Sequence, residues 1–222
     1  ARASFGYSNR DGYGRNIVNG ENVGGGEDIS ARLSMRLQPR DSIRIDLIGE
    51  YQNRKANPAL LAVTNIGQNG TASPFALRAD FEEVLKARRF EFDDVNSTTS
   101  DTWSLTANTD IDFGFATLNM ITGWRNWSLD GEQDSDSTGL QLFTNRGVIR
   151  ARQVSQEIRL SSTDDHALTW SVGGLFLYDK TDVEFGIQNF QGLFGLGTDA
   201  LFNAAQKNTA YAVFADAAYD LS

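Results

Sequence analysis

The feature that most constrains this chain is a polarity pattern with a period of two, which recurs along most of its length. In the segment QVSQEIRLSS, residues 153–162, every second residue belongs to one of two sets. Val154 and Ile158 belong to a mostly apolar set, whereas Glu157 and Arg159 belong to a polar set. Because side chains alternate between the two faces of a strand, one face meets an apolar medium and the other meets water.

Eight segments show this alternation, and we predict that each is a β-strand. The segments are 1–10, 28–38, 41–54, 101–113, 116–128, 153–162, 168–178 and 208–221. Most of them reach the ~9–11 residues that a tilted strand needs to cross a bilayer, whereas the mean strand of globular proteins has ~5–6 residues. We expect the three prolines to lie outside the strands, because proline cannot donate a ladder hydrogen bond.

The links between these segments alternate between short and long. The short links are QPRD, FGFA and TDDHA, and the long links are 11–27, 55–100, 129–148 and 179–207. Outer-membrane barrels have short turns on the periplasmic side and long loops outside. The order therefore predicts an all-β fold, namely an antiparallel transmembrane β-barrel section of about eight strands.

The alternation alone does not decide whether the apolar face contacts lipid or a second sheet. In a barrel it faces lipid, and aromatic residues near the strand ends, such as Tyr51 and Tyr178, form interfacial girdles. In a soluble secreted β-sandwich that binds carbohydrate, the same face packs on a second sheet and buries Trp103, Trp124 and Trp170. A small self-closed outer-membrane barrel is a further alternative.

Composition excludes several classes of function. The net charge of −9 argues against a nucleic-acid partner, since phosphate binding needs clustered Lys and Arg. The chain has no Cys and one His, and no apolar run is long enough for a transmembrane helix. No catalytic constellation is visible, so we expect no enzymatic activity, no cofactor and no metal. A barrel with an enzymatic or autotransporter role would need such a constellation on its lumen face.

Several segments resemble the barrel of TonB-dependent outer-membrane receptors. They are SFGYSNRDGYGRNIVNG at 4–20, ARLSMRLQPRDSIRIDLIGEYQNR at 31–54, SQEIRLSS at 155–162 and LTWSVGGLFLYD at 168–179. The resemblance covers nearly the whole chain and is weak in the loops, which vary in such proteins. It implies a 22-stranded barrel with a plugged lumen in the outer membrane of a Gram-negative bacterium.

The resemblance also implies a function and a set of partners. Such receptors import scarce nutrients, commonly ferric siderophores or similar chelates, with energy from the inner-membrane TonB complex. The expected partners are therefore outer-membrane lipid, the receptor's own plug, the TonB complex acting through that plug, and the chelate. We find no plug, no TonB-contacting segment and no terminal aromatic strand within residues 1–222, and we interpret the chain as a partial barrel.

Two groups of residues are candidates for functional contacts. Glu157 and Arg159 are predicted to face the lumen, where they contact the plug or form a solvated or cross-strand-paired ladder. The last long link, read as a loop, is rich in phenylalanine: Phe185, Phe190, Phe194 and Phe202. An apolar cluster in an outer loop can hold an aromatic or hydrophobic substrate, or it can fasten the loop to its neighbours.

Other features have weaker implications. Segment 73–89 has a capping Ser73 and a helical apolar face, which predicts a loop helix or an extracellular lid. The link after residue 128 carries Asp134, Asp136 and Thr138 in the order that opens a calcium loop, but position twelve is Asn145 rather than Glu, so an acidic solvated loop is the better interpretation. Trp127 falls on the polar-face register and is expected above the membrane, in an outer loop.

Overall fold

The structure is a computed structural model that describes residues 1–58, 89–90, 92–93, 96–135, 139, 144–163, 167–188 and 199–220. The strands are β1 (Arg2–Arg10), β2 (Gly14–Asn16), β3 (Asn22–Val23), β4 (Gly26–Arg40), β5 (Ile43–Ala56), β6 (Arg89–Phe90), β7 (Ser97–Asp112), β8 (Ala116–Asp134), β9 (Thr144–Ser162), β10 (Leu168–Gln188) and β11 (Ala200–Tyr219). Among these residues no helix is long and apolar enough to cross a membrane. The expected helix at 73–89 lies outside the described residues.

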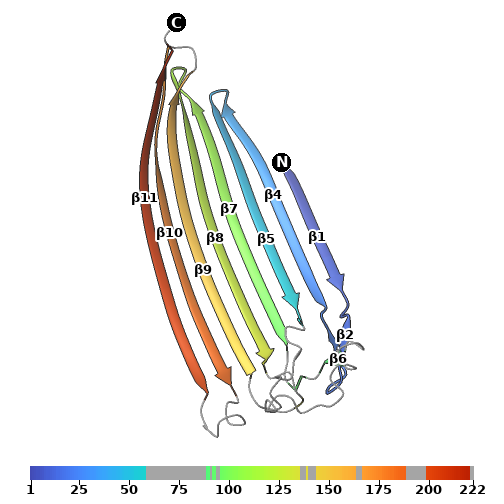
Figure 1. The fold of residues 1–222 in the computed structure, drawn as a ribbon. Helices are drawn as coiled ribbons and strands as arrows, with labels where there is room; N and C mark the ends of the chain where they lie inside the picture. The colour runs from blue at the N-terminus through green and yellow to red at the C-terminus, as the bar shows by residue number, and fades with distance from the viewer. Residues whose placement is uncertain are drawn as a thin grey trace.

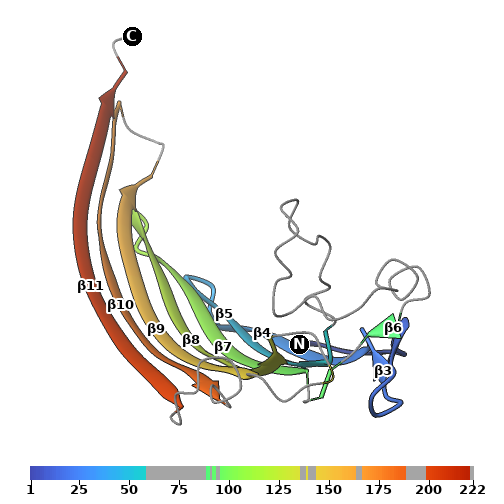
Figure 2. The ribbon, with the colours of Figure 1, turned by 60° about the horizontal axis from the view of Figure 1, so that its bottom comes forward.

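Eight of the strands form one antiparallel sheet, in the order β1-β4-β5-β7-β8-β9-β10-β11. The predicted eight-stranded all-β arrangement is therefore confirmed. Figure 1 shows the strands side by side, and Figure 2 shows that the sheet is strongly curved. β1 and β11 lie at opposite edges and do not pair with each other, so the chain does not form the small self-closed barrel that was one alternative.

The eight-stranded sheet is a single layer, and its apolar face is not covered by the other described residues. Trp103 is 51% exposed and Trp124 is 41% exposed. The soluble sandwich required both indoles to be buried between two sheets, and that expectation is wrong. Within the described part of the chain, the buried apolar residues are few: Val23, Phe92, Ala116 and Val148. The large apolar surface of this sheet consequently needs a covering medium beyond the described residues.

The links between β4 and β5 and between β7 and β8 are tight turns, with one difference from the prediction. Gly114 has φ of 85°, and its backbone N–H donates to Asp112 Oδ1 at 2.7 Å, which closes the turn between β7 and β8. Pro39, which we expected outside the strands, lies inside β4. The register shifts between Leu37 and Arg40 at this point. A bulge tolerates proline because one residue is already unpaired there.

Four strands extend well beyond their predicted ends, towards the long links. β8 continues to Asp134, β9 begins at Thr144, β10 continues to Gln188 and β11 begins at Ala200. The predicted loops 129–148 and 179–207 are therefore strand over much of their length. In these extensions, polar residues lie on the face that is apolar in the rest of the strand. The predicted pattern therefore ends there, although the backbone pairing continues.

A small second sheet lies at the end of the molecule where the strands meet the long links (Figure 1), and its strand order is β3-β2-β6. Asn16 joins its parts, because its side chain donates to the carbonyl of Phe92 at 2.8 Å and accepts from the N–H of Phe92 at 3.2 Å. Asn16 is 3% exposed and Phe92 is 2% exposed. The predicted loop 11–27 thus contains β2 and β3. Hydrogen bonds connect it to Phe90 and Phe92.

Candidate functional site

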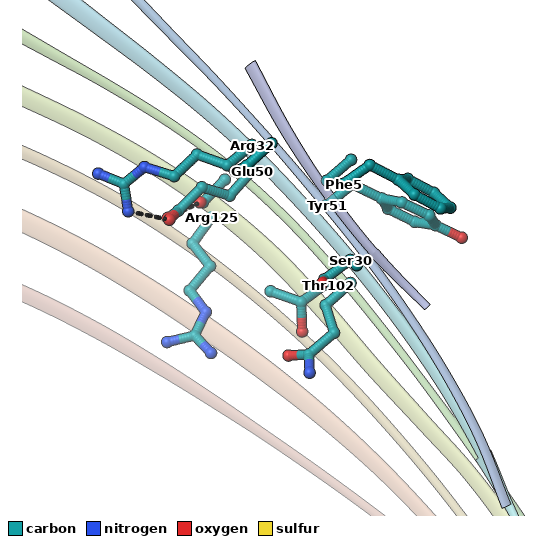
Figure 3. Close-up of a pocket in the computed structure, with 12 residues that line it drawn as sticks. Phe5, Ser30, Arg32, Glu50, Tyr51, Thr102 and Arg125 are labelled. Atoms are coloured by element: carbon teal, nitrogen blue, oxygen red, sulfur yellow. Dashed lines mark hydrogen bonds and ion pairs between the residues drawn. The ribbon is translucent and has the colours of Figure 1, made fainter. Parts of the chain in front are cut away.

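The polar face of the eight-stranded sheet is concave. A hollow of about 580 Å³ is lined on that face by five neighbouring strands, β1, β4, β5, β7 and β8. Figure 3 shows Arg32, Glu50 and Arg125 on one side of the ribbon, and Phe5 and Tyr51 on the other. The alternation predicted from the sequence therefore separates a polar concave face from an apolar convex face.

Aromatic side chains on the convex face mark a boundary that crosses the strands obliquely. Trp103 of β7 begins a cross-strand row that ends at Lys207 of β11. The aromatic residue of β11 on this boundary is Tyr211, four residues nearer the short turns than Lys207. Four strand spacings are about 19 Å and four residues about 13 Å, so the boundary slopes by about 35°. Barrel strands tilt by ~35–45° to the membrane normal, which fits a flat membrane surface at this boundary.

The cross-strand row from Arg125 to Asn208, which lies just above this boundary, divides each of the strands β8–β11 into two parts. The lower segment comprises residues 116–124, 154–162, 168–178 and 209–219, and the upper segment comprises residues 126–134, 144–152, 180–188 and 200–207. In the lower segment the convex face is apolar, as at Ile158 and Val172, which are 44% and 46% exposed. The concave face of the same segment carries Glu157 and Arg159.

In the upper segment the two faces exchange polarity. The convex face now carries charged residues, including Arg150, whose guanidinium lies 3.2 Å from the Glu184 carboxylate. The concave face carries a row of aliphatic residues, in which Leu129, Ile149 and Val183 are neighbours on β8, β9 and β10. Such an exchange is expected where a strand leaves lipid and its outer face meets water.

On β4, β5 and β7 the charges of the concave face are paired across the strands. Arg36 forms two hydrogen bonds to Asp46, at 2.6 and 3.0 Å, and Arg54 lies 2.9 Å from Asp28. A further ion pair joins Arg44 to Asp110. These exposed pairs lie opposite each other in the register, as cross-strand pairs do when both faces of a sheet are specified.

A single polar row crosses the whole sheet on the concave face. From β1 to β11 its members are Ser4, Arg32, Glu50, Ser104, Arg125, Gln153, Asp179 and Asn208. In its first half, Glu50 accepts from Arg32 at 2.7 Å and from Ser104 at 3.1 Å. In its second half, the Arg125 guanidinium has no ion pair or hydrogen bond among the described residues.

Arg125 lines both the large hollow and a second one of about 390 Å³. The second hollow is lined also by Trp127, Ala151, Gln153 and Asp179, which belong to the polar row and the row above it. The indole N–H of Trp127 donates to Ser100 Oγ at 3.1 Å. The small side chain of Ala151 leaves the space beside this indole open. The site therefore offers a free cation and a carboxylate, about 10 Å apart across two strand spacings.

The structure corrects the predicted position of Trp127 and adds the polar row, which was not predicted. Trp127 lies on the polar face as predicted, but in β8 rather than in a loop. Arg125, Gln153 and Asp179 were not singled out, because nothing local distinguishes them. Their common feature is the cross-strand register, which a single sequence does not display.

Glu157 and Arg159 lie on the concave face of β9, as predicted. Glu157 has Ile121 and Leu175 as its cross-strand neighbours, and Arg159 has Asn119 and Gly173. Within the described part of the chain, neither side chain forms an ion pair. They are thus not part of a cross-strand charge ladder, and their contact with a plug stays a prediction.

Phe185 and Phe202 lie in β10 and β11, not in a loop as we expected. They face each other across the two strands, with ring centroids 6.3 Å apart, and are 38% and 58% exposed. Both belong to the concave face of the upper segment. Phe190 and Phe194 lie outside the described residues. A role of these side chains in binding a ligand stays a prediction.

Asp134 is not the solvated acid of an open loop. It is the last residue of β8, is 1% exposed, and accepts a hydrogen bond from the backbone N–H of Asp93 at 3.0 Å. Its backbone N–H donates to Asn96 at 3.0 Å. Asp134 therefore links the end of β8 to Asp93 and Asn96.

Comparisons with known proteins agree with this geometry. No protein-family model matches the sequence, and no curated protein matches it significantly. Among solved structures, the ferric yersiniabactin uptake receptor FyuA from Yersinia pestis matches 99% of this chain with a TM-score of 0.59 and 14% identity. The RagAB peptide transporter matches 98% with a TM-score of 0.52 and 14% identity. The chain has the fold of a section of these transport proteins. It spans 39% of the first solved chain and 28% of the second.

Proposed function

We propose that the chain is part of the barrel wall of a TonB-dependent receptor in the outer membrane of a Gram-negative bacterium. The receptor takes up a scarce nutrient, a ferric siderophore or a similar chelate, with energy from the TonB complex. The observation that carries the proposal is the exchange of polarity between the two faces of β8–β10 above an oblique aromatic boundary. Lipid outside and a polar lumen inside account for the lower segment, and water outside accounts for the upper segment.

The concave face suits an anionic chelate. The free guanidinium of Arg125 lies where a carboxylate or another acidic oxygen of a cargo can form charge-assisted hydrogen bonds. Phe185 and Phe202 offer a separate apolar surface on the same face, six residues beyond Asp179, where an aromatic part of a cargo can pack before it reaches Arg125. The printed name of FyuA, a ferric yersiniabactin uptake receptor, fits this cargo class.

The open edges of the sheet favour a larger barrel. An unpaired strand edge in lipid is costly, so β1 and β11 pair with further strands of the same receptor. A plug outside residues 1–222 fills the lumen, and Glu157 and Arg159 contact it. DNA on either side of this segment should encode a plug-sized domain upstream and more alternating strands downstream. A start codon directly before Ala1 and a stop codon directly after Ser222 would contradict the proposal.

Quenching of tryptophan fluorescence by brominated lipid tests the membrane placement. Single-tryptophan variants that keep Trp103, Trp124 or Trp127 are reconstituted in vesicles of brominated phosphatidylcholine. We expect strong quenching of Trp103 and Trp124, which are exposed on the convex face. Trp127 is the matched control, because it lies in the same sheet on the concave face. Equal quenching of all three indoles, or of none, would overturn the placement.

Uptake of radioactive iron as a ferric siderophore tests the transport function. The complete receptor is expressed in cells that lack their own receptor for that chelate, with and without a working TonB complex. We expect uptake only in cells with the complex, and reduced uptake by Arg125→Gln. Uptake that does not depend on the TonB complex would contradict the energy source, and no uptake of any anionic chelate would contradict the cargo class.

A further inference from the structure

A row of cations lies on the convex face of the upper segment, next to the aromatic boundary. Arg152 of β9, Lys180 of β10 and Lys207 of β11 are direct cross-strand neighbours. Adjacent strands are about 4.8 Å apart, so the three residues span about 10 Å along the surface. We call these three residues the cation row.

Two of the three members of the cation row have no ion-pair partner within the described part of the chain. Arg152 and Lys207 are exposed and take part in no ion pair or hydrogen bond there. The ammonium group of Lys180 lies 2.6 Å from Asp182, two residues further from the boundary. Like charges directly opposite each other in a sheet are unfavourable, so an anion from outside the sheet would stabilise this alignment.

The position of the cation row on the strands indicates where such an anion would lie. Arg152 and Lys180 lie two residues, or about 7 Å, above Val154 and Tyr178, which end the apolar band on their strands. A side chain this far above an aromatic girdle lies at the level of the lipid headgroups. Lysine and arginine side chains are also long enough to reach along the surface towards that level.

The rest of the convex face does not share this charge. Above Tyr51 and Trp103, the next residues on β5 and β7 are Asn53 and Asp101. Asp101 accepts hydrogen bonds from Asn53 at 2.7 Å and from Tyr51 at 3.4 Å. Lys55, four residues above Tyr51 on β5, is a further cation of this face, but it lies opposite Glu27. Among the described residues, the aligned cations at the boundary therefore belong to β9–β11.

We propose that the cation row binds the phosphate groups of anionic lipids in the leaflet that surrounds the barrel. The proposal rests on the membrane placement proposed above. Arg152 can engage two phosphate oxygens at once, and Lys207 adds a point charge beside it. Phosphate oxygens between the strands offset the repulsion between the three aligned cations.

Native mass spectrometry of the complete receptor in detergent tests this proposal. The probes are phosphatidic acid and diacylglycerol with the same acyl chains, which differ only in the phosphate. We expect phosphatidic acid to bind far more tightly than diacylglycerol. The double variant Arg152→Gln/Lys207→Gln should weaken its binding about 30-fold, since each cation near a membrane surface contributes a factor of about five. Arg152→Lys/Lys207→Arg, which keeps both charges, should retain most of it.

The double variant Arg36→Gln/Arg54→Gln is the matched control, because it removes the same charge from the concave face at residues outside the proposed cargo and plug contacts. It should leave the binding of phosphatidic acid unchanged. Equal binding of the two lipids, or equal loss in both double variants, would overturn the proposal. Displacement by millimolar inorganic phosphate would instead identify a free-phosphate site. Brominated-lipid quenching of Trp103 and Trp124 reports the membrane placement separately, so failure of one proposal is distinguishable from failure of the other.

Discussion

The lower and upper segments of β8–β11 are continuous strands with opposite polarity. In the lower segment Ile158 faces outward and Arg159 inward, whereas in the upper segment Arg150 faces outward and Ile149 inward. The backbone ladder runs through both without a register shift. Pairing of strands is therefore indifferent to the surrounding medium, and the side chains alone record where that medium changes.

The same comparison separates paired from unpaired charge. Below and beside the boundary, on β4, β5 and β7, Arg36 and Arg54 have carboxylate partners on neighbouring strands. On β8 and β9, Arg125 and Arg152 have none among the described residues. Charges that are satisfied within the sheet stabilise the wall, and charges that are free on it are available to a cargo, a plug or a lipid.

The largest expected effect comes from a charge in the apolar band. Ile158→Arg should lower the free energy of unfolding in lipid vesicles by ~2–4 kcal/mol, because a cation near the bilayer midplane is poorly solvated. Leu201→Arg, on the convex face of the upper segment, should cost only ~0–1 kcal/mol. Leu201 is 70% exposed, which makes it a matched aliphatic control. Denaturant unfolding measures both, and equal costs would mean that the two segments share one medium.

A smaller effect is expected from glycines on the concave face. A Cβ on Gly173, in the lower segment, would lie 2.4 Å from the Phe214 ring and 2.7 Å from the carbonyl oxygen of Ile158. Gly173→Ala should therefore destabilise the protein by ~1–3 kcal/mol through overpacking. Gly147→Ala, in the upper segment, meets no atom within 4 Å and should change stability by less than ~0.5 kcal/mol. A neutral Gly173→Ala would show that the Phe214 ring is not held against the strand.

The smallest effect is expected from the ion pair on the outer face of the upper segment. Arg150 and Glu184 are 61% and 53% exposed at their side chains. Glu184→Gln should reduce stability by less than ~1 kcal/mol, and the reduction should shrink as salt is added. Thermal unfolding at low and high salt measures this. A larger effect that persists at high salt would mean that this face is shielded from water, against the proposed exchange of media.

The strand set and the two faces were predictable because they depend on local alternation. Val154 and Ile158 were placed on the apolar face from their spacing alone, and the structure has them there. The strand ends were predicted wrongly at β8–β11, because the rule assumed one polarity for each face. Phe185 was assigned to a loop for that reason, because it lies in the upper segment, where the concave face is apolar and the convex face is polar.

The candidate functional residues, in contrast to the strands, could not be grouped from the sequence. Residue type and face were visible for Arg125, Gln153 and Asp179, but their alignment across three strands was not. Register depends on where long connections bring two strands together, and every one-residue slip moves a side chain to the other face. By itself, the sequence determined that this chain forms long strands with one apolar and one polar face. Only the tertiary structure decided which charges meet a partner and which remain free, because partners on neighbouring strands are distant along the chain.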